Sequence, residues 1–253
     1  MDRIKVKVLN PYAVNDAAWM MVCAARMTQK GHKIKTMEDF EELYSKPYQP
    51  GTLKAMYGLP HPTIQKFGVI NVVVVGASRR FLAQITRHQN EVKFMSASLQ
   101  YSDYSGEADF TVPYEILVDE AEKAEYLDQC RKAMTEYSRL VETGINNDAA
   151  GYLAPQGLRN VLLISATPYQ WKHIIGQRSC RRNTSETRYV VLKIWEALYK
   201  ISPEMFAPGF TGPFCQRSSC MEGKMSCGNP IAKEATPGEI LKEDFPLLCG
   251  GAE

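Results

Sequence analysis

A short run of β-branched residues is the feature that most limits how this chain can fold. Residues 67–75 are rich in valine and isoleucine, and Gly76 follows them directly. This composition and length are typical of a buried strand. Ser78 stands where it can cap a helix, and Phe81 and Ile85 then recur at helical spacing. The sequence therefore predicts a buried strand, a tight turn, and a helix that runs to His88.

Hydrophobic periodicity predicts the other elements. Residues 4–8 alternate between apolar and charged, as in a half-buried strand, and residues 158–166 suit a further strand. An apolar stripe through residues 114–141 predicts one long amphipathic helix. Beyond Pro203 glycine, proline and cysteine accumulate, so we expect an irregular tail. Helices are also expected over residues 17–26, around 37–44, from Pro168 through Trp171 and Ile175, and over 186–200.

Composition narrows the functional class. Hydrophobic residues make up 45% and charged residues 23% of the 253 residues, which is the balance of a globular protein with one large domain. A net charge of +2 gives no global electrostatic case for nucleic acid or a membrane surface. The longest apolar stretch, residues 72–77, is too short to span a bilayer. Without a signal peptide before the seven cysteines, we expect a reducing, cytoplasmic location.

Two basic clusters stand out against this near-neutral background. Residues 78–88 contain three arginines, a glutamine and a histidine, and residues 178–182 contain three more arginines. Arginine offers a planar fork of donors for phosphate oxygens, and a helix N-terminus adds oriented N–H groups. Either cluster alone is equally well explained as a solvated basic face. Together they favour a small anionic ligand.

The order of several short motifs resembles flavin-dependent thymidylate synthases. The family signature is Arg-His-Arg followed at short intervals by Ser, Asn-Glu, Ser and Arg-Tyr, and residues 84–101 are similar to it. Flanking features agree in order, and nearly in spacing, over residues 24–214, although the spacing to Tyr101 is one residue longer than usual. The matching positions are Ala24, Ala25, Arg26, His61, Thr63, the turn at 76–79, Gln84, Arg87, His88, Ser96, Ser98, Tyr101, Leu153, Pro155, Arg178, Glu186 and Arg188.

This resemblance implies a mixed α/β (α+β) fold, with an antiparallel-rich central sheet and long flanking helices. It also implies a homotetramer with FAD held between subunits. The family reaction is reductive methylation of dUMP at C5 to dTMP, with methylenetetrahydrofolate as carbon donor and NADPH as reductant of the flavin. Residues 1–214 would form the catalytic domain, and residues 215–253 a Cys/Gly/Pro-rich tail.

The resemblance also assigns roles to single residues. Arg178 would hold the pyrimidine or its phosphate, Ser98 would lie beside the phosphate, and His88 would face the FAD. For the histidines, a buried packing role is the alternative. The implied catalytic set is Arg178, Ser98 and His61; the nucleotide-binding set is Gln84, Arg87, Ser96, Ser98, Gln100 and Arg178; the cofactor-binding set is Thr63, Arg87, His88, Gln89, His173 and Arg182.

Several positions depart from the family pattern. Gln89 replaces the second arginine of the signature, Met95-Ser96 falls where Asn-Glu is expected, and Gln100 replaces the last arginine. Losing an arginine fork costs about 1 kcal/mol or more of charge-assisted binding unless another residue compensates. Arg80, Lys93, Arg181 and Arg182 are candidates for that compensation.

Three functions therefore stay open. The chain is a thymidylate synthase with an altered phosphate site, a C5-alkylating enzyme for another uracil nucleotide such as UMP, or a flavin- or nucleotide-binding protein without catalysis. We favour the first two, because Gln84, Arg87, His88, Arg178 and Glu186 are all retained.

The tail carries a separate pattern. Cys215, Cys220 and Cys227 lie close together in sequence, with Cys249 further on. Clustered thiolates in a reducing compartment suit a tetrahedral zinc site. The spacing is looser than paired C-x-x-C knuckles, so ordinary free cysteines are the alternative.

Overall fold

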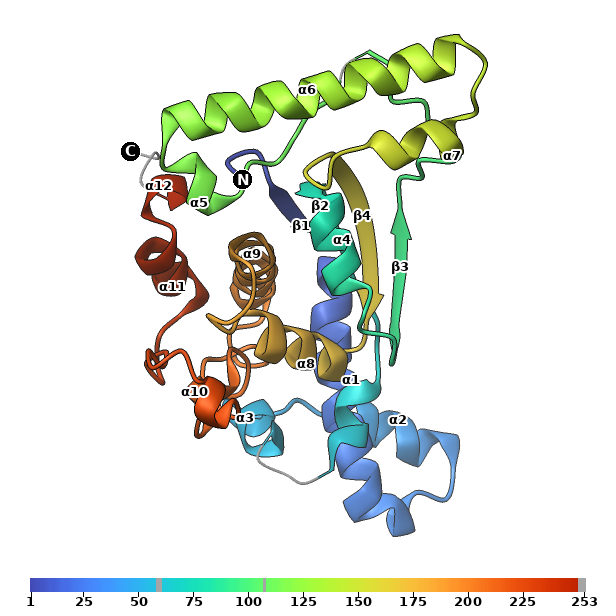
Figure 1. Cartoon of the computed structure of the whole chain (residues 1–253). Coiled ribbons are helices and arrows are strands. Elements are labelled where there is room, and N and C mark those ends of the chain that lie inside the picture. The colour runs from blue at the N-terminus through green and yellow to red at the C-terminus, as the bar shows by residue number, and fades with distance from the viewer. Residues whose placement is uncertain (58–60, 107, 250–253) are drawn as a thin grey trace.

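A four-stranded antiparallel sheet forms the centre of the molecule. The computed structural model describes residues 1–57, 61–106 and 108–249. The strand order is β1-β2-β4-β3, and every neighbouring pair is antiparallel. The expected α/β fold with an antiparallel sheet is thereby confirmed (Figure 1). The strands are β1 (Lys5–Val8), β2 (Ile70–Ser78), β3 (Val92–Ser96) and β4 (Arg159–Ala166).

Strand β2 follows the β-branched run but is shifted along it. It begins at Ile70 rather than at residue 67, because Gly68 turns the chain at φ +82° against Ala17 of the first helix. The strand also continues past Gly76 to Ser78, through a register shift between Val75 and Ala77. Gly76 has φ +84°, so the glycine forms a bulge inside the strand instead of ending it.

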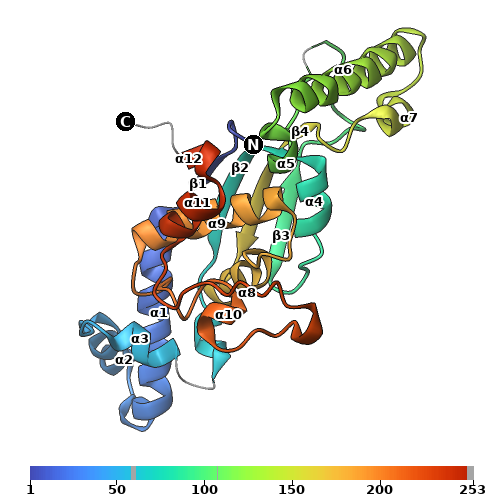
Figure 2. The same cartoon turned by 60° about the vertical axis from the view of Figure 1, so that its left-hand side comes forward.

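Helices bury one face of this sheet. Helix α9 (Ser185–Ile201) packs against β1 and β2, and α1 (Pro11–Lys30) packs against β2 and α9. Helix α8 (Pro168–Arg178) packs against α9 on the same side of the sheet (Figures 1 and 2). The inward side chains of β2 and β4 and the ring of Trp195 belong to one hydrophobic core. Helices α1, α8 and α9 therefore cover the inner face of the sheet.

The opposite face of the sheet is exposed and carries apolar side chains next to three lysines, Lys5, Lys7 and Lys93. Side chains alternate along a strand, so every second residue of β2, β3 and β4 points away from the core. Met95 is 72% exposed and Leu163 is 37% exposed. We call this surface the outer sheet face; its exposed apolar members are Val75, Met95, Val161 and Leu163.

The segment expected as one long helix contains a break. Helix α5 (Tyr114–Leu117) ends before Asp119, whose side chain accepts hydrogen bonds from the backbone of Ala121 and Glu122. An N-cap of this kind starts a new helix, α6 (Glu120–Glu142). Figure 1 shows α6 crossing over one end of the sheet, where it covers a second, smaller core around Tyr137.

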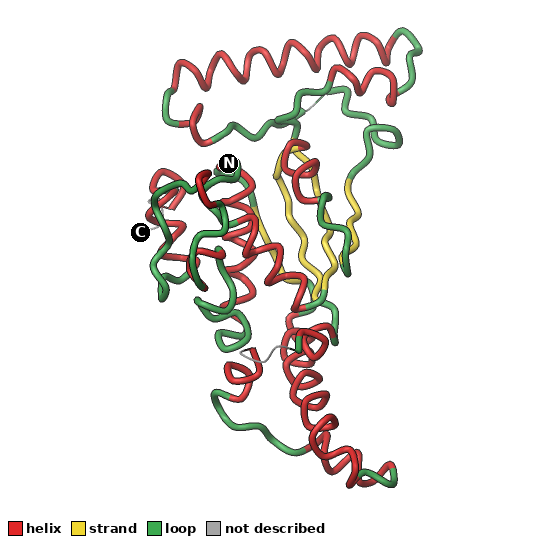
Figure 3. The backbone as a smooth tube through the Cα atoms, turned by 60° about the horizontal axis from the view of Figure 1, so that its bottom comes forward, coloured by secondary structure: helices red, strands yellow, loops and turns green. Residues whose placement is uncertain are grey.

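The tail is only partly irregular. Loops dominate between α9 and the last helices (Figure 3), but three short helices also form. Helix α11 packs against α9. Residues 250–253 of the predicted tail lie outside the described residues. The division into a catalytic domain and a tail stays a prediction. The remaining elements are α2 (Met37–Ser45), α3 (Thr52–Tyr57), α4 (Arg79–Ile85), α7 (Asn147–Ala150), α10 (Phe214–Arg217), α11 (Pro237–Asp244), α12 (Pro246–Cys249), and the 3₁₀ turns η1 (Gly31–Lys33), η2 (Pro62–Lys66), η3 (Gly151–Leu153) and η4 (Gly223–Met225).

Within the described residues, no helix has the length and apolar character needed to cross a membrane.

The bulge at Gly76 provides a test of this fold. A Cβ at this position would lie 3.1 Å from the carbonyl oxygen of Arg3, and the positive φ adds strain. We expect Gly76→Ala to lower the free energy of unfolding by about 1–2 kcal/mol, measured by urea denaturation. Gly31→Ala is the control, because its Cβ would meet nothing within 4 Å. Equal stability of the two variants would contradict a strained bulge.

Candidate functional site

The guanidinium of Arg178 is the centre of the candidate site. Thr167 caps α8, and buried Trp171 and Ile175 anchor the helix in the core, which places Arg178 at its C-terminal end. Its Nε donates to Nε2 of His88 over 2.9 Å, and its Nη2 donates to the carbonyl oxygen of Gln84 over 3.0 Å. The arrangement joins α8 to α4 and to the chain that follows α4.

Asn183 completes the set of acceptors around Arg178. Its Oδ1 accepts from Nη1 of Arg178 over 3.3 Å, and its own amide donates to the carbonyl oxygens of Gln177 and Cys180. The sequence analysis did not single out this residue. Its position five residues beyond an arginine, in the turn before the next helix, is too common a pattern to have revealed it.

Two arginines of the site lie near each other without a balancing carboxylate. Burial, and then the charge of Arg87, lower the pKa of Arg178 from its ordinary value. The nearby Arg181 and Arg188 pair with Asp244, whereas Arg87 and Arg178 form no ion pair among the described residues. A half-buried guanidinium with a second positive charge nearby is stabilised by an anionic ligand.

Two histidines adjoin Arg178. The rings of His88 and His173 meet edge to face at 5.9 Å. Burial, and then the charges of Arg178 and His173, lower the pKa of His88 to about 4. Burial and Arg217 also lower the pKa of His173. His88 is therefore neutral at pH 7, with Nε2 accepting from Arg178 and the proton on Nδ1. It lies after α4, not within it, because that helix ends at Ile85.

A cavity of about 280 Å³ is lined by His173 and by the buried Lys172. Nζ of Lys172 donates to Oε1 of Gln65 over 3.0 Å and lies 2.9 Å from the centre of the Tyr57 ring. Burial, and then the charge of Arg217, lower the pKa of Lys172 well below its ordinary value. Sequence reasoning missed Lys172 and Arg217, since a lysine beside a histidine in a helix has the pattern of an exposed residue.

Three predicted nucleotide-binding residues, Ser96, Ser98 and Gln100, lie elsewhere in this chain. We call them the serine end of the predicted site. Ser96 is the last residue of β3, a strand that begins shortly after His88 and runs away from it. Oγ of Ser98 accepts from the backbone nitrogens of Gln100 and Tyr101, which shapes a turn. Five extended residues span about 16 Å. One chain therefore brings together Gln84, His88, His173 and Arg178, but does not bring Ser96, Ser98 or Gln100 to them.

The other predicted ligands are exposed. His61 and Thr63 stand at the start of η2, and Arg87 and Gln89 flank His88 with their side chains in solvent. Arg182 is exposed and lines a second cavity. Their roles as ligands stay predictions.

Glu186 does not belong to the site around Arg178, although the resemblance linked the two. Its buried carboxylate accepts hydrogen bonds from the backbone nitrogen and the hydroxyl of Ser78, at 2.7 Å for the nitrogen. Burial raises the pKa of Glu186. Arg188 likewise holds the carbonyl oxygen of Ser179 and the carboxylate of Asp244. These two residues fix the fold around the site.

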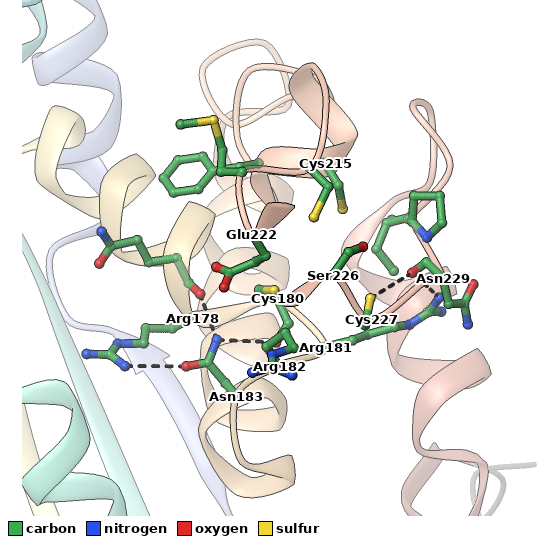
Figure 4. A pocket seen from close by; sticks show the side chains of 16 residues that line it. Arg178, Cys180, Arg181, Arg182, Asn183, Cys215, Glu222, Ser226, Cys227 and Asn229 are labelled. Carbon is green, nitrogen blue, oxygen red and sulfur yellow. Dashed lines mark hydrogen bonds between the residues drawn. The ribbon is translucent and has the colours of Figure 1, made fainter. Parts of the chain in front are cut away.

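The expected zinc site on Cys215, Cys220 and Cys227 is not found. Among the described residues, no group of three or more histidine, cysteine, aspartate or glutamate side chains is placed to hold a metal ion. The physical reason is that the three thiols do not converge on one point. Instead they line a cavity of about 320 Å³ next to Arg178 and Asn183 (Figure 4).

Comparison with known proteins identifies the family. The profile of the family "Thymidylate synthase complementing protein" matches residues 12–204, which is most of the chain. The chain belongs to the thymidylate synthase complementing protein family. This match confirms the resemblance inferred from the motifs. It also confirms, at the level of the family, the prediction of an enzyme of the flavin-dependent thymidylate synthase type.

Relatives within this family are distant. The flavin-dependent thymidylate synthase of Thermococcus onnurineus is 26% identical over 201 residues, which cover 74% of this chain and 78% of that protein. The enzyme of the same name from Thermococcus kodakarensis is 27% identical over 180 residues, or 68% and 73% of the two chains. Among solved structures, a UMP/dUMP methylase PolB from Streptomyces cacaoi, bound with 5-Br dUMP, has a TM-score of 0.62 at 16% identity. The match covers 80% of this chain and 93% of PolB, and it shows a shared fold.

The neutral state of His88 makes the stability of this family member depend on pH. Its folded pKa of about 4 lies below the ordinary value of 6.5, so the unfolded chain takes up a proton first as the pH falls. The stabilisation is complete above about pH 6.5 and is lost towards pH 4, with a total on the order of 3 kcal/mol.

We expect the free energy of unfolding to fall less between pH 6.5 and pH 4 in His88→Gln than in the wild type. Glutamine keeps an acceptor for Arg178 and cannot titrate. Urea denaturation at a series of pH values measures the difference, and parallel curves for the two proteins would show that His88 is not held neutral by the fold.

Proposed function

We propose that this protein catalyses FAD-dependent reductive methylation of C5 of dUMP, giving dTMP, with methylenetetrahydrofolate and NADPH as co-substrates. The observation that carries the proposal is the half-buried guanidinium of Arg178, which neutral acceptors hold in place and which has no carboxylate partner among the described residues. The family membership and the names of the relatives support the reaction type.

The residues of the site fit a flavin. FAD combines a flat ring system with a pyrophosphate, so it needs flat apolar contacts and cationic donors in one place. The cavity beside His173 supplies the rings of Tyr57, Phe210 and Phe214 together with the cationic Arg217. When bound, the flavin would supply the hydride chemistry that no protein side chain can provide.

The chain itself would bind and orient the nucleotide. Arg178 has all three of its guanidinium nitrogens fixed by acceptors, so its planar fork is held in one orientation before a ligand arrives. A preorganised donor loses little entropy on binding and can polarise a carbonyl or neutralise a phosphate. His88 contributes by staying neutral, which leaves the positive charge of Arg178 to the ligand.

The second candidate function is the same type of reaction on UMP instead of dUMP. The structural relative PolB is named as a methylase of both UMP and dUMP, and the signature arginines replaced by Gln89 and Gln100 leave a changed environment for the phosphate. A related enzyme that alkylates UMP therefore stays the alternative, and both nucleotides belong in the binding experiment. The cytoplasmic location also stays a prediction.

We also propose that the active unit is a homotetramer with sites shared between chains. The outer sheet face exposes four apolar side chains in a contiguous sheet, a surface that soluble proteins usually cover. A second copy would cover it. Sharing between chains would also explain why Ser96, Ser98 and Gln100 lie apart from Arg178 within one chain, because another chain could bring its serine end to this site.

Absorption and binding measurements on Arg178 variants test the reaction proposal. The wild type is expected to show a flavin spectrum, or to take up FAD, and to change that spectrum on addition of dUMP. Arg178→Ala should weaken nucleotide binding roughly ten- to a hundredfold, since hydrogen bonds to charged groups contribute about 1.5–3 kcal/mol. Arg178→Lys, which keeps the charge but loses the fork, should fall between the two.

The control is Arg139→Ala, in which an arginine paired with Glu136 on exposed α6 is removed. It should bind nucleotide as the wild type does. A protein that takes up no FAD would refute the flavoenzyme proposal, and an unchanged affinity in Arg178→Ala would refute the role of that residue. A larger response to UMP than to dUMP would select the second candidate.

The tetramer is tested by placing a charge on the outer sheet face. Leu163→Glu should lower the mass measured by light scattering after gel filtration, because a buried carboxylate at a subunit contact is costly. Met37→Glu is the matched control at an exposed position, 65% accessible, away from the sheet. A wild-type mass equal to one chain, or an unchanged mass in Leu163→Glu, would contradict this assembly.

A further inference from the structure

The cavity beside His173 contains a buried amine that the proposed methylation does not use. Lys172 lies in α8, is only 6% exposed, and lines this cavity of about 280 Å³. Its Nζ donates to Oε1 of Gln65 over 3.0 Å and lies 2.9 Å from the centre of the Tyr57 ring. Neither partner is an anion, and Lys172 forms no ion pair with a carboxylate among the described residues. Nothing described there balances a positive charge on this side chain.

A lysine in such surroundings is a neutral amine. Burial, and then the charge of Arg217, lower the pKa of Lys172 well below its ordinary value. A neutral amine has two N–H groups and one lone pair. Gln65 accepts one N–H and the face of the Tyr57 ring can accept the other. The lone pair is then left for an electrophile that enters the cavity, as in enzymes that use a desolvated lysine as nucleophile.

The hydroxyl of Tyr57 is a second group that points to a ligand. It is buried, belongs to a residue that lines the same cavity, and has no hydrogen-bond partner among the described residues. Burial, and then the charge of Glu204, raise the pKa of Tyr57, so the hydroxyl keeps its proton and can donate it. Buried polar groups in folded proteins normally have a partner. A carbonyl oxygen of a ligand would supply the missing acceptor.

Arg217 adds a positive charge to the wall of the cavity. Its Nε donates to the carbonyl oxygen of Gly212 over 3.2 Å, and its Nη2 donates to the carbonyl oxygen of Lys172 over 2.8 Å. Both acceptors are neutral. Burial lowers the pKa of Arg217 only to about 10, so the guanidinium stays charged at pH 7. A carboxylate on a ligand would offset this charge through a charge-assisted hydrogen bond.

We propose that Lys172 forms a reversible imine with a small carbonyl compound that carries a carboxylate, the class of glyoxylate and the 2-oxo acids. The lone pair of Nζ attacks the carbonyl carbon while Tyr57 donates to the carbonyl oxygen and Arg217 holds the carboxylate. Both protons of the amine leave with that oxygen as water, and a carbon–nitrogen double bond forms. The step needs no oxidant or reductant, and hydrolysis reverses it.

This site does not depend on the proposed methylation. FAD is far larger than a cavity of about 280 Å³, so a bound flavin could place only a part of itself there. A small carbonyl compound, in contrast, fits inside it as a whole. The nucleotide-binding role proposed for Arg178 is not involved, because Arg178 does not line this cavity.

Trapping of the imine with a reductant tests the proposal. The full chain, as purified, is incubated at pH 7 with glyoxylate and cyanoborohydride, which converts the imine into a stable carboxymethyl group on the lysine. Peptide mass spectrometry then follows the labelled fraction of each lysine with time. We expect Lys172 to be labelled at least about tenfold faster than the exposed Lys132, because an exposed lysine is neutral in fewer than about one molecule in a thousand at pH 7.

Two variants separate the roles of the side chains. Tyr57→Phe keeps the ring and removes the unpartnered hydroxyl, so labelling of Lys172 should slow about fivefold or more. Arg217→Gln removes the cation, so the ratio of labelling by glyoxylate to labelling by propanal, which has no carboxylate, should fall about tenfold. Tyr152→Phe is the matched control, because Tyr152 is 91% exposed and does not line the cavity, and it should label as the wild type does.

Other results would overturn the proposal. Equal labelling of Lys172 and Lys132, or no labelling of Lys172, would show that the amine is protonated or closed to ligands. An unchanged ratio of the two aldehydes in Arg217→Gln would refute the carboxylate-bearing class. The wild-type experiment requires no substitution, so it decides the main point even where a variant does not fold. FAD uptake measured on the same sample distinguishes a failure of this proposal from a failure of the proposed function.

Discussion

The buried carboxylate of Glu186 holds the junction between β2 and α4 against α9, and the candidate site depends on that contact. Ser78 donates to it with both its backbone nitrogen and its hydroxyl, and the same hydroxyl accepts from the backbone of Phe81 at the start of α4. Hydrogen bonds to a charged group contribute about 1.5–3 kcal/mol each, and burial excludes water as a competitor. The direction of α4, and with it the position of His88, follows from this junction.

The charge of Arg178 is not balanced by a carboxylate among the described residues. Arg188, by contrast, is paired with Asp244. Arg178 is instead surrounded by neutral acceptors, and Arg87 adds a second positive charge nearby. Such an arrangement reduces the stability of the free protein and is favourable for binding an anion. The adjacent cavity of about 320 Å³ is also lined by Arg178, Arg181 and Arg182.

The two faces of the sheet differ in what covers them. The inner face is closed by α1 and α9 and supplies the rigid support that positions α8. The outer face presents apolar side chains that one chain leaves exposed. Strand β3 carries the serine end of the predicted site away from Arg178. Under the proposed assembly, a second chain would therefore be needed to complete the site.

Sequence by itself determined the elements and the family. The β-branched run, the cap at Ser78 and the amphipathic stripes are local properties, and local backbone preference with burial of one face is enough to specify them. The ordered motifs around Arg87, His88 and Arg178 were sufficient for the resemblance. The ends of helices were harder to predict from sequence, because capping and tertiary contacts decide them. Helix α4, for example, ends at Ile85 and not at His88.

The tertiary structure decided which of these residues meet. It separated Glu186 from Arg178, placed Lys172 in a buried cavity, and gathered Cys180 with the cysteines of the tail. No periodicity in the sequence carries this information, because contacts between distant segments arise from how helices and strands pack on a common core. Burial then changed the chemistry of the side chains, and the lowered pKa of His88 exists only where the fold excludes water.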